Sequence, residues 1–253
     1  MIRQRGVVRI GVSPDLPGIS IRSNIPAGFK GAEASLALLV GKALLGHPTG
    51  VQLVGVDSPE RLVKLQAGAI DLAIGQITIT PQRQRLVDFS IPYVTAYEAL
   101  LLPATSTISS LNQLNGQSVS VADGSASQPR YQKQWPLIRL VATPSVSGGL
   151  ELLRRGAVVA WANDNTNING MLSVIPDRNR YRLLDVGACF APKPYGIAIR
   201  KGSPALLAWL NAFLEKQQSN GQLARLFADV NGQSTATEVG SCDANANANA
   251  NAK

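Results

Sequence analysis

The first 75 residues alternate between strand-like and helix-like segments, and this order constrains the fold more than any other feature of the chain. Residues 7–12, 51–56 and 69–74 are short apolar runs that predict strands. Residues 32–45 predict an apolar helix, and a second helix is predicted from Pro59 to Leu65 with Ser58 as its N-cap. The order β-α-β-α-β indicates a parallel sheet with crossover helices.

A second stretch repeats this alternation further along the chain. Residues 118–122 and 158–162 predict strands, and residues 146–155 predict a helix. Two more helices are predicted over residues 204–218 and 221–228. The sequence therefore indicates an α/β protein with a second sheet-based unit.

The segment at residues 75–90 gives the clearest indication of a binding site. A predicted strand ends here, Thr80 is a predicted N-cap, and Pro81 occupies the first position of a short helix. Arg83 then falls in the first turn, close to helix N–H groups that have no partner within the helix. A guanidinium at such a position suits a carboxylate held by two hydrogen bonds. The alternative is an ordinary helix cap followed by a solvated surface arginine.

Residues 75–93 closely resemble the signature of the polar amino-acid binding proteins that serve bacterial ABC importers, the extracellular solute-binding protein family 3. That signature reads roughly Gly-x-Thr-Ile-Thr-x-x-Arg-x-x-x-Val-Asp-Phe-Ser-x-Pro-Tyr, and nearly every fixed position is filled here. The same ligand core occurs in ionotropic glutamate receptors. The resemblance implies an α/β, two-lobe periplasmic-binding-protein type II fold, with each lobe a sheet flanked by helices and the lobes joined by two hinge crossings.

The resemblance also implies domain boundaries. Lobe 1 is expected over residues 1–93 and 196–232, and lobe 2 over residues 98–190. The hinge crossings are expected at residues 94–97 and 191–195. Residues 233–253 are a polar tail that ends in alternating Asn and Ala, and disorder is expected beyond Cys242.

An α-amino acid site needs a cation for the carboxylate and an anion for the ammonium. The resemblance assigns the carboxylate to Arg83 together with the hydroxyl of Thr78. Ser125 and Ala126, in a loop of small residues, are expected to add backbone N–H groups. Asp164, at the end of a predicted strand, is the expected partner of the ammonium, and its alternative is an ordinary N-cap aspartate.

The other expected ligand contacts include departures from the family pattern. Gln76 stands where glutamine-type relatives often have Gly, and its backbone carbonyl is expected to accept from the ammonium. Relatives often stack aromatic residues on the ligand near Leu16 and Ser58, and neither position is aromatic here. The missing aromatic residues weaken the case for long aliphatic or aromatic ligands, and no acidic cluster beyond Asp15 and Asp164 is visible for a cationic one. A neutral polar or acidic ligand is therefore favoured. Ser13 and Tyr195 complete the expected set.

Composition excludes several other classes of function. The net charge of +8 can indicate nucleic-acid binding, but the 24 Lys and Arg residues are scattered and are not interleaved with aromatic residues. No apolar run reaches the roughly 18 residues of a membrane span. One His and two widely spaced Cys lack the spacing of metal ligands, and no cofactor is expected. We expect a monomer without a nucleic-acid partner.

Cys189 and Cys242 are expected to form a disulfide. The family is normally exported, so the chain is expected to be periplasmic or extracytoplasmic and to begin after an excised signal peptide. An exported context favours pairing, and ionotropic glutamate receptor cores place a bridge in similar positions. The alternative is two free thiols.

The sequence therefore predicts a solute-binding protein, not an enzyme, that captures an L-amino acid between two lobes for the membrane subunits of an ABC importer. Two alternatives stay open. An enzyme on the same fold, of the cyclohexadienyl dehydratase type, would need an acid–base carboxylate beyond the binding residues. An excised amino-acid sensor domain of a receptor would have the same sequence features.

Overall fold

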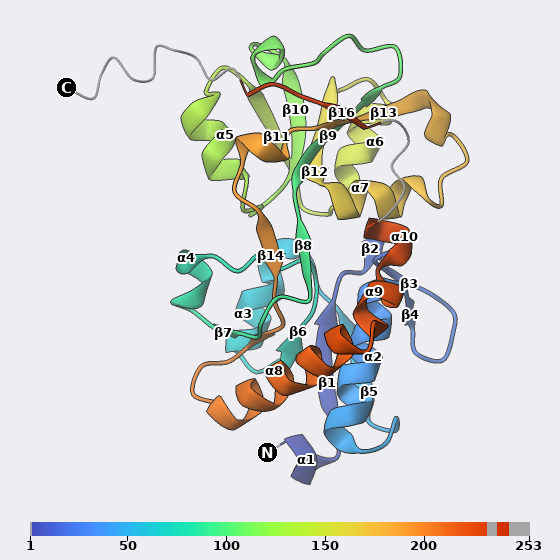
Figure 1. The fold of residues 1–253 in the computed structure, drawn as a ribbon, viewed down its shortest axis with the longest axis vertical. Coiled ribbons are helices and arrows are strands. Elements are labelled where there is room, and N and C mark those ends of the chain that lie inside the picture. The colour runs from blue at the N-terminus through green and yellow to red at the C-terminus, as the bar shows by residue number, and fades with distance from the viewer. Residues whose placement is uncertain (1, 232–236, 243–253) are drawn as a thin grey trace, which may run out of the picture. The chain divides into compact units, whose positions relative to one another are not determined.

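The chain folds into two compact units in the computed structural model, which describes residues 2–231 and 237–242 (Figure 1). The first unit comprises Met1–Thr95 and Lys193–Asn231, and the second comprises Ala96–Pro192 and Gly232–Lys253. The chain passes between the units after Thr95, after Pro192 and after Asn231. The first two crossings lie within the segments predicted as hinges, and their hinge role stays a prediction. The tail predicted to be disordered beyond Cys242 lies outside the described residues.

A five-stranded sheet forms the centre of the first unit. Its order is β5-β1-β6-β15-β7, with β1 parallel to β5 and β6, and β15 antiparallel to β6 and β7. The predicted parallel arrangement of the first strands is therefore confirmed. Strand β15, where the chain re-enters the first unit, is antiparallel to them. The strands are β1 (Val8–Val12), β5 (Val51–Gly55), β6 (Leu72–Ala73), β7 (Asp88–Phe89) and β15 (Ala198–Ile199).

Helix α2 (Ala32–Leu45) has the predicted bounds and covers this sheet with a stripe of apolar side chains. Leu36, Val40 and Leu44 recur every four residues and are buried, which is the pattern of an amphipathic helix on a core. Gly46 ends the helix in the left-handed region at φ 84°, where glycine is not strained. Helix α8 (Pro204–Ser219) buries Leu210 and Leu214.

The predicted N-cap at Ser58 is wrong. The chain enters this helix through a 3₁₀ turn, η1 (Ser58–Glu60), before α3 (Arg61–Gln66) begins. Asp57 holds the cap position, and Ser58 is already the first residue of the turn, with Pro59 after it. The remaining elements of the first unit are α1 (Ile2–Arg5), α4 (Pro81–Gln84), α9 (Gln222–Leu226), α10 (Ala228–Asn231) and the small antiparallel sheet of β2 (Asp15–Leu16), β3 (Ser20–Arg22) and β4 (Phe29–Lys30).

A six-stranded sheet of order β11-β10-β12-β9-β13-β16 forms the second unit. Strand β10 is parallel to β11 and β12, β9 is antiparallel to β12 and β13, and β16 is parallel to β13. The strands are β9 (Glu98–Pro103), β10 (Ser118–Ala122), β11 (Arg139–Thr143), β12 (Ala160–Asp164), β13 (Tyr181–Asp185) and β16 (Thr237–Val239).

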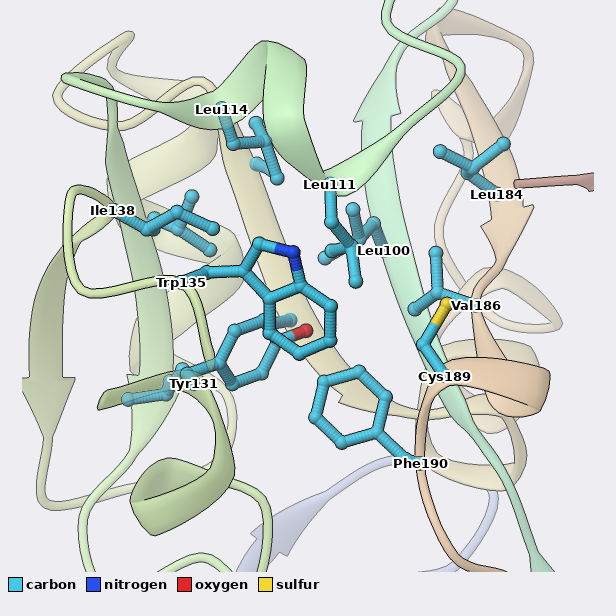
Figure 2. Close-up of a cluster of buried hydrophobic side chains, with 14 of the residues drawn as sticks. Leu100, Leu111, Leu114, Tyr131, Trp135, Ile138, Leu184, Val186, Cys189 and Phe190 are labelled. Atoms are coloured by element: carbon cyan, nitrogen blue, oxygen red, sulfur yellow. The ribbon is translucent and has the colours of Figure 1, made fainter. Parts of the chain in front are cut away.

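The second unit contains an aromatic core to which the segments around η2 (Leu111–Leu114), α5 (Gln128–Gln134) and η4 (Gly187–Cys189) contribute. Tyr131 of one helix, Trp135 directly after that helix and Phe190 of a distant segment pack together (Figure 2), with ring centroids 4.8–6.1 Å apart. All three side chains are buried. The second unit also contains α6 (Gly148–Arg154), α7 (Asn165–Leu172) and η3 (Arg178–Arg180).

The predicted disulfide between Cys189 and Cys242 is confirmed, with a Cα–Cα distance of 5.2 Å. Cys189 lies beside Val186 at the edge of the aromatic core (Figure 2). The bond attaches the end of the described chain to the second unit, next to β16. Sequence analysis did not predict β16, because its segment is polar and forms a strand only by pairing with β13.

A further two-stranded sheet contains β8 (Val94–Ala96) and β14 (Lys193–Tyr195), the segments in which the chain passes between the units. Within residues 2–231 and 237–242, no helix has both the length and the apolar character needed to cross a membrane.

Candidate functional site

The short helix α4 fixes Arg83 after the end of β6. Pro81 is its first residue, and Thr80 is its N-cap, whose Oγ1 accepts a hydrogen bond from Arg83 N at 3.2 Å. This confirms the predicted cap. The Arg83 guanidinium folds back along the chain, and its Nη1 donates to the backbone carbonyl of Thr78 at 2.9 Å. Arg83 is therefore oriented by both its backbone and its side chain.

Thr78 and Tyr195, two predicted ligand contacts far apart in sequence, are neighbours in the first unit. They form an isolated antiparallel bridge, and Ile79 N donates to Pro194 O at 2.8 Å. Both side chains are buried. This pairing joins the segment before α4 to β14.

Gln76 adopts an unusual conformation two residues before Thr78. Its φ of 51° is in the left-handed region, which costs a residue with a side chain about 1–3 kcal/mol. Its backbone N–H donates to Glu33 Oε1 at 2.9 Å, and its Nε2 donates to Glu33 Oε2. Gln76 Oε1 is buried and has no hydrogen-bond partner among the described residues. Both nitrogens of Gln76 are therefore engaged by one carboxylate.

Glu33 is a charged residue on the buried face of α2, 1% exposed. Burial raises the pKa of Glu33, opposed by hydrogen bonds from Tyr93 and Gln76 and by the charge of Arg61. The Tyr93 hydroxyl donates to Glu33 Oε1, and burial together with the Glu33 charge raises the pKa of Tyr93 well above its usual value. Three donors and the nearby charge of Arg61 therefore stabilise this buried carboxylate.

Arg61, whose charge acts on Glu33, lies near Ser58 and Ser13, two other residues predicted to contact the ligand. Its Nε donates to the backbone carbonyl of Ser58 at 3.3 Å, and Arg61 is 9% exposed. A Cβ added to Gly75 would lie 3.4 Å from Arg61 Cδ and 3.6 Å from Ser13 N. The ends of β1 and β6 and the start of α3 therefore meet at Gly75.

Ser13 and Leu16 follow β1 but have different surroundings. Ser13 Oγ donates to Asp15 Oδ1 at 3.3 Å, and its carbonyl accepts from Ser20 Oγ at 2.7 Å. Leu16 is fully buried in β2 and contributes to the core of the first unit. Ser13 thus presents polar groups near Gly75, and Leu16 contributes apolar packing.

In the second unit, Asp164 is the last residue of β12 and the N-cap residue of α7. Its side chain makes no cap hydrogen bond, although it is 9% exposed. Asp164 therefore occupies the N-cap position of the alternative reading but lacks its capping hydrogen bond, and its role at the ligand stays a prediction. Glu98 of β9 lies directly opposite Asp164 on the neighbouring antiparallel strand and is 1% exposed. Directly opposite residues share one face of a sheet.

Glu98 is held by two hydroxyl groups. Tyr131 donates to Glu98 Oε1 at 3.1 Å, and Ser127 donates to Glu98 Oε2. Burial, the neighbouring Glu98 and the charge of Asp164 raise the pKa of the Tyr131 hydroxyl well above its usual value. Negative potential therefore gathers around the end of β12, which favours a cation there.

Ser125 and Ala126 lie in the loop after β10. Gly124 turns the chain at φ 66°, and the N–H of Ser125 donates to Ala122 O at 3.1 Å within this turn. Ser125 Oγ is buried without a hydrogen-bond partner in the described part of the chain. Because β10 and β12 are parallel neighbours, this loop and Asp164 follow the same ends of their strands.

In the first unit the structure brings Thr78 together with Arg83 and Tyr195, and Ser13 and Ser58 lie near Gly75 and Arg61, whereas Leu16 is buried in the core. In the second unit the structure places the Ser125–Ala126 loop and Asp164 at the same end of neighbouring strands. It also adds Glu33, Arg61 and Glu98, which sequence reasoning missed. A single acid inside an apolar stretch was the available signal, since Glu33 interrupts the apolar residues 32–45 and Glu98 begins the apolar strand β9. Buried charges require partners, so such positions point to a polar network.

Two bacterial binding proteins are similar to this chain over most of its length. It is 29% identical over 227 residues to the ABC transporter glutamine-binding protein GlnH of Bacillus subtilis (strain 168), covering 89% of this chain and 81% of that protein. It is 32% identical over 201 residues to the glutamine-binding protein of Geobacillus stearothermophilus, covering 79% and 75%.

A solved structure supports the fold. The chain resembles the ancestral amino acid-binding protein AncCDT-1, a precursor of cyclohexadienyl dehydratase, with a TM-score of 0.79, 26% identity, and 90% and 97% of the two chains covered. The predicted periplasmic-binding-protein type II fold is confirmed. The profile of the bacterial extracellular solute-binding proteins, family 3, matches residues 8–233. The chain belongs to this family, as the motif at residues 75–93 predicted.

Proposed function

We propose that this protein binds a free L-amino acid, polar and neutral or acidic, and delivers it to the membrane subunits of an ABC importer. The observation that carries the proposal is the fixed position of Arg83, whose backbone is held by the Thr80 cap and whose guanidinium is held by the Thr78 carbonyl. An oriented planar guanidinium near a helix N-terminus is suited to a carboxylate.

In this proposal the two ends of the amino acid are bound by different units. Arg83 and the Thr78 hydroxyl bind the carboxylate, and Asp164 and the Gln76 carbonyl bind the ammonium. Ser125 contributes its buried hydroxyl, because its N–H is already used in the turn. Ala126 N–H joins it, and Ser13, Leu16, Ser58 and Tyr195 surround the ligand.

The two units close on the ligand through the segments at 94–97 and 191–195, in the manner of a hinged clamp. Both glutamine-binding relatives support a neutral polar ligand. We further propose that the protein acts as a monomer outside the cytoplasmic membrane and binds no nucleic acid.

A second candidate function, an enzyme of the cyclohexadienyl dehydratase type, is favoured by one observation. Glu98 is a buried carboxylate opposite Asp164 and is the kind of extra acid that such an enzyme needs. One Glu98 oxygen accepts a hydrogen bond from Tyr131 and the other accepts one from Ser127, which argues for a structural role. Absorbance at the wavelength of an aromatic product, after incubation with a cyclohexadienyl acid, distinguishes the two functions.

A thermal-shift screen of the twenty L-amino acids, one at a time, tests the proposed function. A ligand present at 100 times its Kd stabilises the native state by about 2.7 kcal/mol. For units of this size the melting temperature rises by about 2–4 °C per kcal/mol, so a shift of at least about 5 °C is expected. The D-enantiomer of the best ligand is the control. A flat response to all twenty contradicts the proposal.

A further inference from the structure

We propose that Gln76 Oε1 accepts a hydrogen bond from the side chain of the ligand, and that Glu33 positions it to do so. The ligand is then an L-amino acid whose uncharged side chain carries a hydrogen-bond donor, such as an amide, a hydroxyl or a thiol. This inference rests on the proposed function and narrows its ligand class.

Glu33 determines the orientation of the Gln76 side-chain amide, that is, whether Nε2 or Oε1 faces the Glu33 carboxylate. The carboxylate accepts from both the backbone N–H and the Nε2 of Gln76. With Glu33 ionised, a flipped amide would place Oε1 against a carboxylate oxygen, leaving two acceptors in contact with no proton between them. Tyr93 donates to the same carboxylate and keeps Glu33 in place. Oε1 must therefore point away from Glu33.

Gln76 carries two independent departures from ordinary structure. Its backbone is in the left-handed region at φ 51°, where glycine would be unstrained. Its Oε1 is a buried acceptor with no partner among the described residues, and the large majority of buried side-chain polar atoms in proteins have one. Strain and unsatisfied polar groups gather at functional sites. Both occur here two residues before Thr78 and seven before Arg83.

Because Gln76 Oε1 can only accept a hydrogen bond, it favours a ligand side chain that carries a donor. An ionised carboxylate has no proton to donate and is repelled, and an apolar side chain leaves the acceptor unsatisfied. The proposed function already gives the ammonium to Asp164 and to the Gln76 carbonyl. The remaining donor on the ligand is in its side chain.

Calorimetric titration with matched ligand pairs tests the inference. The pairs are L-glutamine and the γ-methyl ester of L-glutamate, L-asparagine and the β-methyl ester of L-aspartate, L-serine and O-methyl-L-serine, and L-cysteine and S-methyl-L-cysteine. Each second member has lost its donor. For the best-binding pair we expect the wild-type protein to prefer the donor by about 10- to 100-fold, the usual effect of leaving a buried acceptor unsatisfied.

Two substitutions at position 76 separate the effect of the Oε1 acceptor from the effect of side-chain volume. Gln76→Gly removes the side chain and suits the local backbone, so it keeps the fold, and the preference should fall to about 3-fold or less. Gln76→Met keeps similar bulk without an acceptor and should give the same loss. Glu33→Gln frees the amide to turn, so the preference should also fall.

A preference that stays above 10-fold in both Gln76 variants overturns the inference. So does a wild-type protein that binds amino acids but does not prefer the donor in any pair, and in that case the proposed function stands. If the wild-type protein binds none of the amino acids, the proposed function fails and the inference fails with it.

Discussion

Removing the disulfide between Cys189 and Cys242 should destabilise the second unit, which contains both cysteines. Both cysteines belong to the second unit, and their bond holds the segment that contains β16. The substitution Cys242→Ser is the better perturbation, because Cys189 is 2% exposed in the core and its sulfur then remains as a small apolar group.

The size of the effect follows from the loop that the bond closes. The two cysteines are 53 residues apart, which gives a loop entropy of about 14 cal/mol/K, or about 4 kcal/mol at 25 °C. This is an upper value, because Lys193–Asn231 of the loop belong to the first unit and because β16 can detach before the rest of the second unit unfolds. Other contacts oppose detachment: Gly240 N donates to Asp185 O at 2.7 Å, Ser241 N donates to Ser109 O at 3.0 Å, and Arg182 pairs with Glu238 at 2.8 Å.

Urea unfolding followed by tryptophan fluorescence measures this loss. Trp135 and Trp161 lie in the second unit and Trp209 in the first, so a Trp209→Phe background reports on the second unit alone. With a slope of about 2 kcal/mol per molar urea, the midpoint should fall by up to about 2 M in Cys242→Ser. Wild-type protein with reductant is the matched control. An unchanged midpoint, or two thiols that alkylate fully without reductant, would refute the reasoning.

Three further predictions concern the ligand and the charged groups. Asp164→Asn should weaken α-amino acids at least about 10-fold more than their des-amino analogues, because it deletes the charge that faces the ammonium; equal losses in calorimetry would make Asp164 structural. Small-angle scattering should give a smaller radius of gyration at saturating ligand, and an unchanged radius would contradict closure. Burial alone would raise the pKa of Asp71, but its hydrogen bonds and ion pairs with Arg9 and Arg5 lower it below the ordinary 3.8. Its stabilising effect is therefore present above pH 3.8 and is lost as the pH falls below it, so Asp71→Asn should flatten acid unfolding in that range.

Local sequence signals predicted the elements that depend on local physics. Helix α2 has the predicted bounds because its apolar residues repeat every four positions and Gly46 ends it. Thr80 is the N-cap as predicted. Pro81 follows it at the first helical position, where the backbone N–H that proline lacks would have no partner within the helix. The cap at Ser58 failed, because Pro59 is compatible with a 3₁₀ entry that places Ser58 inside the turn.

Sequence reasoning could not assign the features that depend on distant partners. Glu33 can be buried because Gln76 and Tyr93, 43 and 60 residues away, donate to it. Glu98 can be buried because Ser127 and Tyr131 donate to it. A lone acid in an apolar stretch indicates that partners exist and does not identify them.

Calorimetric titration of the wild-type protein and of Arg83→Ala, with the best amino acid from the thermal-shift screen, tests the central claim most directly. Losing a desolvated charge-assisted pair costs about 2–5 kcal/mol, so the affinity should fall at least about 30-fold while the circular dichroism spectrum stays unchanged. Arg83→Lys should fail almost as badly, because an ammonium cannot make the two parallel hydrogen bonds of a guanidinium. Binding by Arg83→Ala with an affinity close to that of the wild type would contradict the account.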